Sequence, residues 1–227
     1  MTVVQPCPEN IEKTPELAYV IGTMQGDGSF CECKIKGKKY KATVLTIEAM
    51  DLEMIEQTRN FFEKSFGRKV AIFRKTKGSY GIRYLVKGLL SAFQKLELDF
   101  TDPPKPPKWV EEKTEFFGAY LAGVIDSDGN VCIKRPTYPM CQIKITSGTP
   151  QIKLQEAVKN NLKCGTNIDT VTDFNKTWKK WTTRSNLRFV ISKKNLEVIK
   201  KFVLPYLTIP RKRNKISEYI ETRYKAG

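Results

Sequence analysis

A nine-residue pattern that occurs twice constrains this chain more than any other feature. Residues 121–129 read LAGVIDSDG, and residues 20–28 read VIGTMQGDG. Both copies have glycine at the third place and Asp-Gly at the end, and their last acids, Asp27 and Asp128, stand 101 residues apart. Because the same order of predicted elements surrounds each copy, the sequence indicates an internal duplication that makes the two acids equivalent.

Hydropathy and turn signals predict two units, each with the order helix–strand–strand–helix–strand–strand–helix. For the first unit we expect helices and strands at 14–26, 30–35, 43–47, 51–66, 70–74, 82–86 and 89–98. For the second we expect them at 114–127, 131–134, 140–146, 149–162, 166–172, 187–191 and 192–205, with a loop over 173–184 and a final basic helix over 211–224. Four prolines between 103 and 107 cannot continue a helix. We therefore place the first repeat at 1–98, a proline-rich linker at 99–112 and the second repeat at 113–227.

Small residues recur four apart on both predicted motif helices, at the positions Gly22, Gly26, Gly118, Ala119, Ala122, Gly123 and Ser127. Such spacing lets two helix backbones approach closely. We expect the two helices to pack together, so that Asp27 and Asp128 converge at their C-terminal ends. Two carboxylates at one point repel unless a cation neutralises them, and hard oxygen ligands favour Mg²⁺. Paired Mg²⁺ ions can support phosphodiester hydrolysis.

The charge balance indicates a polyanionic partner. The chain has 40 Lys and Arg against 24 Asp and Glu, a formal charge of +16, and no histidine. A folded surface with this excess usually meets nucleic acid; the alternative is a basic surface that binds nothing. The lack of histidine excludes histidine triads, His-ligated zinc and nucleases whose general base is histidine.

The six cysteines form no CxxC pair and no regular ladder of spacings. They read as reduced thiols, which predicts an intracellular, reducing compartment such as the cytoplasm or an organelle matrix. No apolar run approaches the roughly 18 residues that span a bilayer, so we expect no membrane partner.

The paired lines resemble the motifs of the LAGLIDADG homing endonucleases, in their single-chain, two-repeat form. The second copy matches closely, the first matches mainly at Gly22, Asp27 and Gly28, and the repeat pattern extends over roughly 14–225. The resemblance implies an α+β fold of two pseudo-twofold-related αββαββα repeats, whose antiparallel sheets form a DNA-binding saddle. It also implies a monomeric, intron-encoded, metal-dependent enzyme that cuts a long, specific site in double-stranded DNA.

A binding-only protein on the same scaffold is the alternative: an RNA-splicing maturase that binds intron RNA, or a DNA-binding regulator. Retention of both acids favours the nuclease. The resemblance further implies that Asp27 and Asp128 hold the metal and that the carbonyls of Gly26 and Ser127 face it. Mg²⁺ is the expected cofactor, and Mn²⁺ or Ca²⁺ can occupy the same sites. For the auxiliary basic group that often follows the third helix, the candidates are Lys105 and Arg211.

Strand alternation predicts which side chains face DNA. On the open face of the sheets we expect Cys33, Ile35, Thr46, Arg83, Lys134, Gln142, Lys144, Thr146 and Arg188. The opposite parity, which includes Val131, Ile133, Ile143, Leu187 and Phe189, should pack on helices. Basic turns and the final helix are better placed for phosphates, through Lys36, Lys39, Lys41, Arg74, Lys75, Lys77, Lys176, Lys179, Lys180, Arg184, Arg211 and Lys212. The alternative for any one of these clusters is a solvated turn.

Overall fold

The computed structural model describes residues 7–8, 10–34, 41–76, 78–100, 103–135, 137–177 and 179–224. The first repeat contains α1 (Pro15–Asp27), β1 (Gly28–Lys34), β2 (Lys41–Ala49), α2 (Leu52–Phe66), β3 (Ile72–Arg74), β4 (Tyr80–Val86) and α3 (Leu89–Lys95). A short helix, α4 (Lys108–Glu111), follows the prolines. The second repeat contains α5 (Thr114–Asp128), β5 (Gly129–Lys134), β6 (Met140–Ser147), α6 (Ile152–Leu162), β7 (Thr166–Asn175), β8 (Lys180–Val190), α7 (Leu196–Val198), η1 (Ile199–Val203) and α8 (Pro210–Tyr224).

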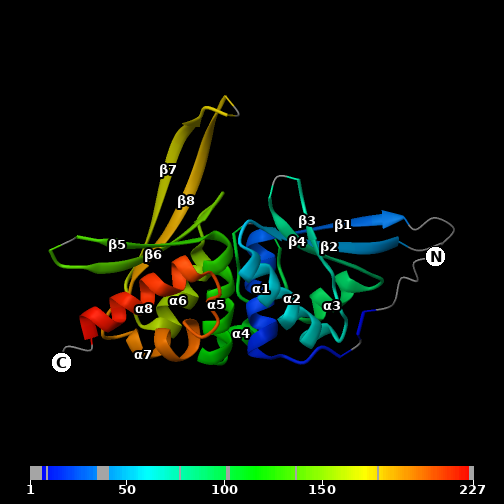
Figure 1. Cartoon of the computed structure of the whole chain (residues 1–227), viewed down its shortest axis with the longest axis horizontal. Coiled ribbons are helices and arrows are strands. Elements are labelled where there is room, and N and C mark those ends of the chain that lie inside the picture. The colour runs from blue at the N-terminus through cyan, green and yellow to red at the C-terminus, as the bar shows by residue number, and fades with distance from the viewer. Residues whose placement is uncertain are drawn as a thin grey trace.

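Each repeat forms one four-stranded antiparallel sheet, with the strand orders β1-β2-β4-β3 and β5-β6-β8-β7. In Figure 1 the sheets lie along the upper side of the molecule and the helices lie beneath them. The α+β architecture predicted from the repeats is confirmed. The two sheets together leave one broad, open face on the side away from the helices (Figure 1).

The motif helices run directly into the first strands of their sheets. Thr14 caps α1, since its Oγ1 accepts a hydrogen bond from the Leu17 N–H at 3.2 Å, and Pro15 follows in the first turn. At the other end, Gly28 adopts extended backbone while its N–H still donates to the Met24 carbonyl. α5 ends in the same way at Gly129. The last residue of each motif helix is therefore an aspartate at the inner edge of a sheet.

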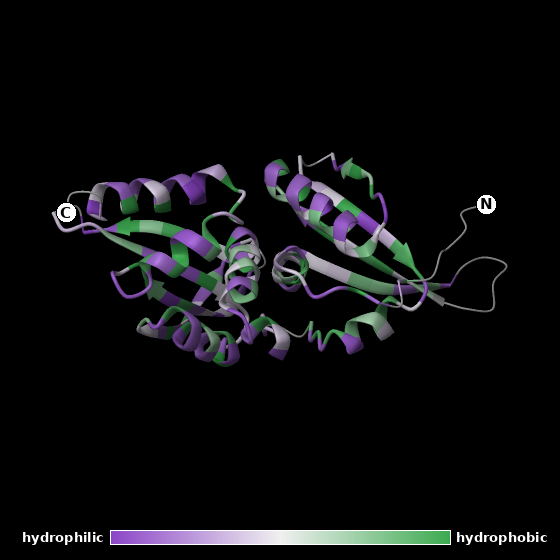
Figure 2. Cartoon of the chain, turned by 90° about the horizontal axis from the view of Figure 1, so that it is seen from below, coloured by the Kyte–Doolittle hydropathy of each residue, from purple (hydrophilic) through white to green (hydrophobic). Residues whose placement is uncertain are grey.

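The two motif helices pack backbone to backbone, as the small residues predict. A Cβ added to Gly22 would collide with the Tyr120 carbonyl oxygen and come within 3.0 Å of the Val124 nitrogen. A Cβ on Gly123 would collide in turn with the Tyr19 carbonyl oxygen. Seen from below, α1 and α5 lie side by side between the repeats (Figure 2). Their buried side chains join the cores of the two repeats into one continuous cluster.

The alternation of the strands follows the prediction except at one strand end. Ile143, Leu187 and Phe189 are buried under the second sheet, and Val131 is buried with them. Ile133, expected to pack on helices, is 45% exposed because it lies near the free end of β5, where the ladder ends at Lys134.

Several expectations about the elements were wrong. Residues 173–184 do not form a loop, because β7 and β8 continue as a paired ribbon as far as Asn175 and Lys180. A regular helix over 192–205 does not form: α7 covers only three residues and the chain then widens into the π-helical turn η1. Some bounds also differ: the third strand of the first repeat begins at Ile72 rather than at residue 70, the helix expected at 89–98 ends at Lys95, and the helix expected at 149–162 begins at Ile152. How far a strand extends and whether a helix stays regular depend on contacts with segments distant in the sequence. The hydropathy pattern of a segment does not reveal these contacts.

Several predicted DNA-contact positions fall outside the described residues, namely Ile35, Lys36, Lys39 and Lys77, as does the side chain of Lys41. In the part of the chain that the structure describes, no helix is long and apolar enough to cross a membrane. All six cysteines are free thiols.

Candidate active site

Asp27 and Asp128 end α1 and α5 on either side of the seam between the repeats. A Cβ added to Gly26 would lie 3.0 Å from Oδ2 of Asp128 and would collide with the Ser127 side chain. The Asp128 carboxylate therefore lies against the backbone of the residue that precedes Asp27. The Ser127 hydroxyl turns back onto its own helix and donates to the Gly123 and Val124 carbonyls at 3.1 and 3.2 Å. The close packing of small residues thus brings the two acids together.

Burial and the short distance between the two acids disfavour the charged form of Asp27. Burial, followed by the charge of the neighbouring Asp128, raises the pKa of Asp27 from its ordinary 3.8 to about 7. Lys212 acts in the opposite direction, and Asp51 adds to the increase. A cation that binds beside Asp27 would stabilise its charged carboxylate form.

The donor set fits a hard divalent cation. Both acids present carboxylate oxygens, and the chain has no histidine that would favour zinc. Among the described residues, no group of three or more His, Cys, Asp or Glu side chains gathers in a metal-binding arrangement. An ion between Asp27 and Asp128 would therefore complete its shell with water, backbone carbonyls or phosphate oxygens, as Mg²⁺ commonly does.

Two tyrosines at equivalent places bind across the seam. Tyr19 of α1 donates to Oδ2 of Asp126 at 2.9 Å, and Tyr120 of α5 donates to Oε1 of Gln25 at 2.6 Å. Gln25 and Asp126 both hold the sixth place of their motifs. Each tyrosine thus fixes the turn that carries the opposite repeat's acid.

The sixth motif residues also hold the segments that pass below the site. Asp126 is buried and accepts hydrogen bonds from the N–H and the hydroxyl of Thr208, both at 2.9 Å. Gln25 donates to the carbonyls of Asp99 and Lys105 at 2.6 and 2.9 Å. These bonds dock the entry to α8 in one repeat and the proline-rich segment in the other.

Lys212, predicted from the sequence only as a phosphate contact, lies at the site. Its side chain is buried, and its Nζ donates to the carbonyls of Ile125 and Asp126, both at 2.7 Å. Burial lowers the pKa of Lys212, while Asp126 and Asp27 oppose the decrease. The sequence places this lysine in a phosphate-binding cluster, but its burial leaves the side chain directed at the end of α5. Lys212 and Arg211 differ in burial only because of how α8 is rotated about its axis. The hydrogen bonds between Thr208 and Asp126 fix that rotation.

The two basic residues proposed for the auxiliary role lie in different settings. Arg211 lines an open pocket with Asp27, Asp51 and Ser127, and its Nη2 is 2.7 Å from Oδ2 of Asp51. Lys105 lies in the proline-rich segment, where its Nζ is 2.8 Å from Oδ2 of Asp99. Arg211 is thus beside the acids, while Lys105 is engaged in the linker. The auxiliary role of both residues stays a prediction.

The predicted base-contact residues lie on the open face of the two sheets. Thr46 and Arg83 are paired neighbours on β2 and β4, and Lys144 and Arg188 are their counterparts on β6 and β8. The remaining members that the structure describes on these strands are Cys33, Lys134, Gln142 and Thr146. Arg188 forms an ion pair with Asp169, with Nε 2.7 Å from Oδ1. Because β7 supplies that acid, the arginine is held in place before any ligand arrives.

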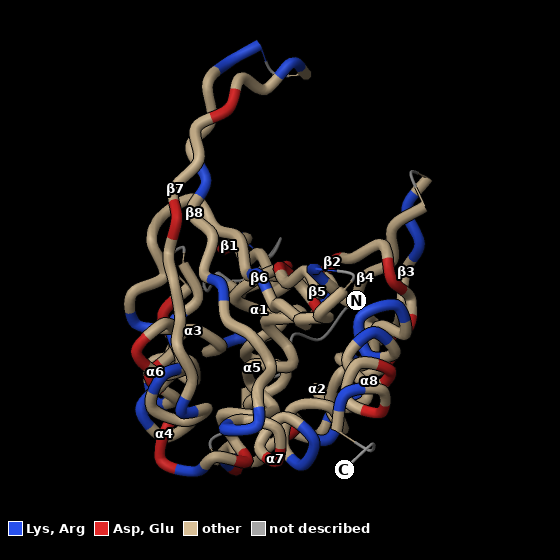
Figure 3. The backbone as a smooth tube through the Cα atoms, turned by 90° about the vertical axis from the view of Figure 1, so that its left-hand side faces the viewer, with Lys and Arg blue, Asp and Glu red and all other residues tan. Residues whose placement is uncertain are grey.

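The predicted phosphate contacts at the turns that the structure describes are exposed, and several have acidic partners. Lys75 pairs with Glu48 at 2.6 Å, and Arg184 pairs with Asp173 at 2.9 Å. The Arg74 guanidinium lies over the Tyr80 ring, 5.6 Å from its centroid. Lys176, Lys179 and Lys180 gather at the tip of the β7–β8 ribbon, where Figure 3 shows a cluster of basic positions.

Structural comparison identifies the fold class. I-SmaMI, in a lysine-to-alanine variant, matches with a TM-score of 0.53 and 14% identity over 93% of this chain and 92% of its own. I-LtrWI, a LAGLIDADG homing endonuclease bound to target DNA, matches at 0.50 and 12% identity over 92% and 91%. I-DmoI, in complex with DNA and Mn, matches at 0.51 and 14% over 85% and 98%. The chain has the two-repeat fold of the LAGLIDADG homing endonucleases, as its motifs predict.

Sequence comparison is less informative than the fold. No protein-family model matches the chain. An uncharacterized protein of Methanocaldococcus jannaschii is 25% identical over 130 residues, which are 56% of this chain and 45% of that protein. The chain therefore spans less than half the length of this relative.

Proposed function

We propose that the chain is a site-specific DNA endonuclease that cuts both strands of a duplex bound on its saddle. The observation that carries the proposal is the meeting of Asp27 and Asp128, one from each repeat, at the seam beneath the open face of the sheets. A protein that only binds nucleic acid has no need of paired carboxylates beside phosphate. The fold shared with DNA-bound I-LtrWI supports a duplex as the partner.

Asp27 and Asp128 would hold the cation, assisted by the carbonyls of Gly26 and Ser127. Mg²⁺ is the expected ion, and the I-DmoI complex with Mn supports a divalent metal at this kind of site. A divalent cation bound there would activate water and stabilise the leaving oxygen of a phosphodiester. The two repeats would supply both half-sites, so a single chain suffices. We place this activity in a reducing intracellular compartment, where six free thiols persist.

We assign the auxiliary basic role in the second repeat to Lys212 in preference to Arg211. Its ammonium group contacts the last carbonyls of α5, the negative end of that helix's dipole. In this position it keeps the end of the motif helix fixed and offsets the repulsion between the acids. Arg211 is exposed and engaged by Asp51, which suits a contact with phosphate.

Cleavage of a duplex library tests the proposal. The full chain is incubated with Mg²⁺ and randomised duplexes, and the cut molecules are sequenced to recover the target. Asp27→Asn and Asp128→Asn should each lower cleavage of that target at least about 100-fold, the usual cost of one electrostatic catalytic group.

Asp51→Asn is the matched control. It makes the same charge change in the same pocket but leaves the acid pair intact, so it should retain most of the activity. Equal cleavage by Asp128→Asn and the unsubstituted chain would contradict the proposed mechanism. Tight binding of intron RNA with no cutting of any duplex would indicate a maturase instead.

A further inference from the structure

The two repeats differ in one hairpin. In the second repeat, β8 pairs with β6 only from Ser185 to Val190. Beyond that point, the ladder with β7 continues through five more pairs, from Val171 with Arg184 to Asn175 with Lys180. In the first repeat, every residue of β4 that pairs with β3 also pairs with β2. Among the described residues of the two equivalent hairpins, only that of the second repeat therefore carries a free two-stranded ribbon, here called the overhang (residues 171–175 and 180–184).

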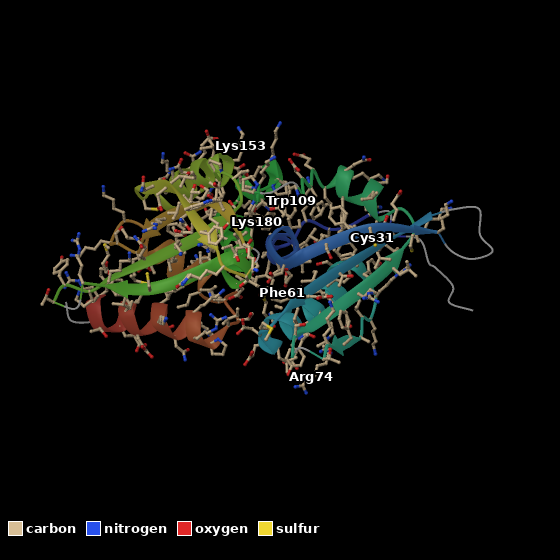
Figure 4. All side chains as sticks on the ribbon, turned by 90° about the horizontal axis from the view of Figure 1, so that it is seen from above. Cys31, Phe61, Arg74, Trp109, Lys153 and Lys180 are labelled. Atoms are coloured by element: carbon tan, nitrogen blue, oxygen red, sulfur yellow. The ribbon has the colours of Figure 1, made fainter. Side chains whose placement is uncertain are left out.

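The overhang rises out of the saddle toward the space above it. Five pairs at about 3.3 Å per residue give a length of roughly 16 Å, without the turn. Figure 1 shows the ribbon standing clear of both sheets on the side away from the helices. Seen from above, Lys180 lies toward the seam rather than beyond the outer end of the repeat (Figure 4). A duplex lying on the saddle would have this ribbon at its flank.

Large apolar side chains are exposed along the overhang. Val171 is 37% exposed, Phe174 48% and Trp181 70%. The Phe174 and Trp181 rings pack edge to face across the ribbon with centroids 5.6 Å apart. Contacts between Thr172 and Thr183, and between Arg184 and Asp173, hold the ribbon together below them. Nothing in the described part of the chain covers the aromatic pair.

The charges at the tip of the overhang indicate which kind of partner it binds. Lys176, Lys179 and Lys180 lie next to the aromatic pair in the sequence, at the end of the ribbon, and Asp173 is paired with Arg184. Lysines next to exposed aromatic rings suit a nucleic acid, because the cations meet phosphates and the rings meet sugars or bases. The overhang is roughly 16 Å long, whereas the major groove is about 8.5 Å deep. Its tip would therefore extend beyond the groove surface that the saddle contacts.

We propose that the overhang is a one-sided clamp, which grips the backbone of the bound duplex on its flank, in the half-site of the second repeat only. This inference rests on the proposed function, since it takes the saddle's DNA as the occupant. It predicts an asymmetric complex: the second half-site is held on two sides and the first on one.

Footprinting tests the clamp. Hydroxyl-radical cleavage of the selected duplex is measured with the Asp128→Asn chain, which blocks cutting, with and without Lys176→Gln, Lys179→Gln and Lys180→Gln together. The intact overhang should protect additional sugars in one half-site, and the triple variant should lose that protection alone. A matched triple on and after α6, Lys153→Gln, Lys159→Gln and Lys163→Gln, should leave the footprint unchanged.

Salt dependence and fluorescence give independent readouts. Loss of three phosphate contacts should reduce the slope of log affinity against log salt by about 2.7, so from 50 to 200 mM salt the intact chain should lose about 40-fold more affinity than the triple variant. In a chain that also carries Trp178→Phe, Trp181→Phe keeps the aromatic pair with Phe174 and should remove most of the emission change that accompanies duplex binding.

A symmetric footprint, with equal salt slopes for both triples, would overturn the clamp and leave the nuclease proposal standing. Absence of specific duplex binding by the intact chain would overturn both.

Discussion

The substitution Gly22→Ala probes the packing that brings the two acids together. The new methyl group would collide with the Tyr120 carbonyl oxygen and press on the Val124 nitrogen and the Gly123 Cα, at 3.0 and 3.2 Å. All three are backbone atoms, which cannot rotate away. To restore ordinary contact distances, α1 and α5 must separate by roughly 1 Å.

The magnitude follows from two opposing terms. Overpacking of this kind costs about 1–3 kcal/mol, and this site lies at the upper end because only backbone can move. Alanine is better than glycine in a helix by about 1 kcal/mol. The net loss of about 2 kcal/mol should lower Tm by roughly 4–8 °C in a chain of this size. Displacement of a catalytic group by about 1 Å can cost about 100-fold in rate, so cleavage should fall by that factor.

Gly118→Ala, on the partner motif helix α5, is the control. Its methyl group would collide with the Phe202 carbonyl of η1, away from the seam. Circular dichroism melting and cleavage of the selected target, both with Mg²⁺, then compare the two variants. We expect similar losses of Tm but a large loss of cleavage for Gly22→Ala alone. Full activity in Gly22→Ala, or equal losses of activity in both, would refute the link between helix approach and the site.

Three further results are expected. Lys212→Met should lower cleavage at least tenfold and shift its pH profile, whereas Lys215→Met, which removes a hydrogen bond from the same helix to Val131, should not. Because the pKa of Asp27 is raised to about 7, the metal-free fold loses stability as the pH rises from about 4 through 7. Asp27→Asn should therefore melt higher than the unsubstituted chain at pH 8 in EDTA, but not at pH 4; identical shifts at both would contradict this. Duplex affinity should fall by about 10³–10⁵ between 50 and 200 mM salt if 6–10 phosphates are bound, and a flat response would exclude that footprint.

The duplicated motif made the fold predictable because it combines two strong local signals. Small residues four apart leave few choices other than close helix packing, and Asp-Gly at the helix end directs the chain into a strand. Alternation then placed Thr46, Arg83, Lys144 and their neighbours on the open face, where the structure has them.

Features that depend on distant partners were not predictable in the same way. Lys212 and Arg211 are adjacent in sequence, and only the docking of Thr208 on Asp126 decides which of them is buried. Residues 173–184 were predicted as a loop because most of their side chains are polar or charged and show no clear alternation. The persistence of the β7–β8 ribbon depends on cross-strand pairs such as Phe174 with Trp181.

The most direct test is the position of the metal itself. Crystals of the chain with its selected duplex and Mn²⁺ can be measured at a wavelength where manganese scatters anomalously. We expect an anomalous peak within coordination distance of both Asp27 and Asp128, next to the scissile phosphates. A complex with ordered DNA in which manganese lies elsewhere, or in which the two carboxylates turn away from each other, would contradict the shared metal site.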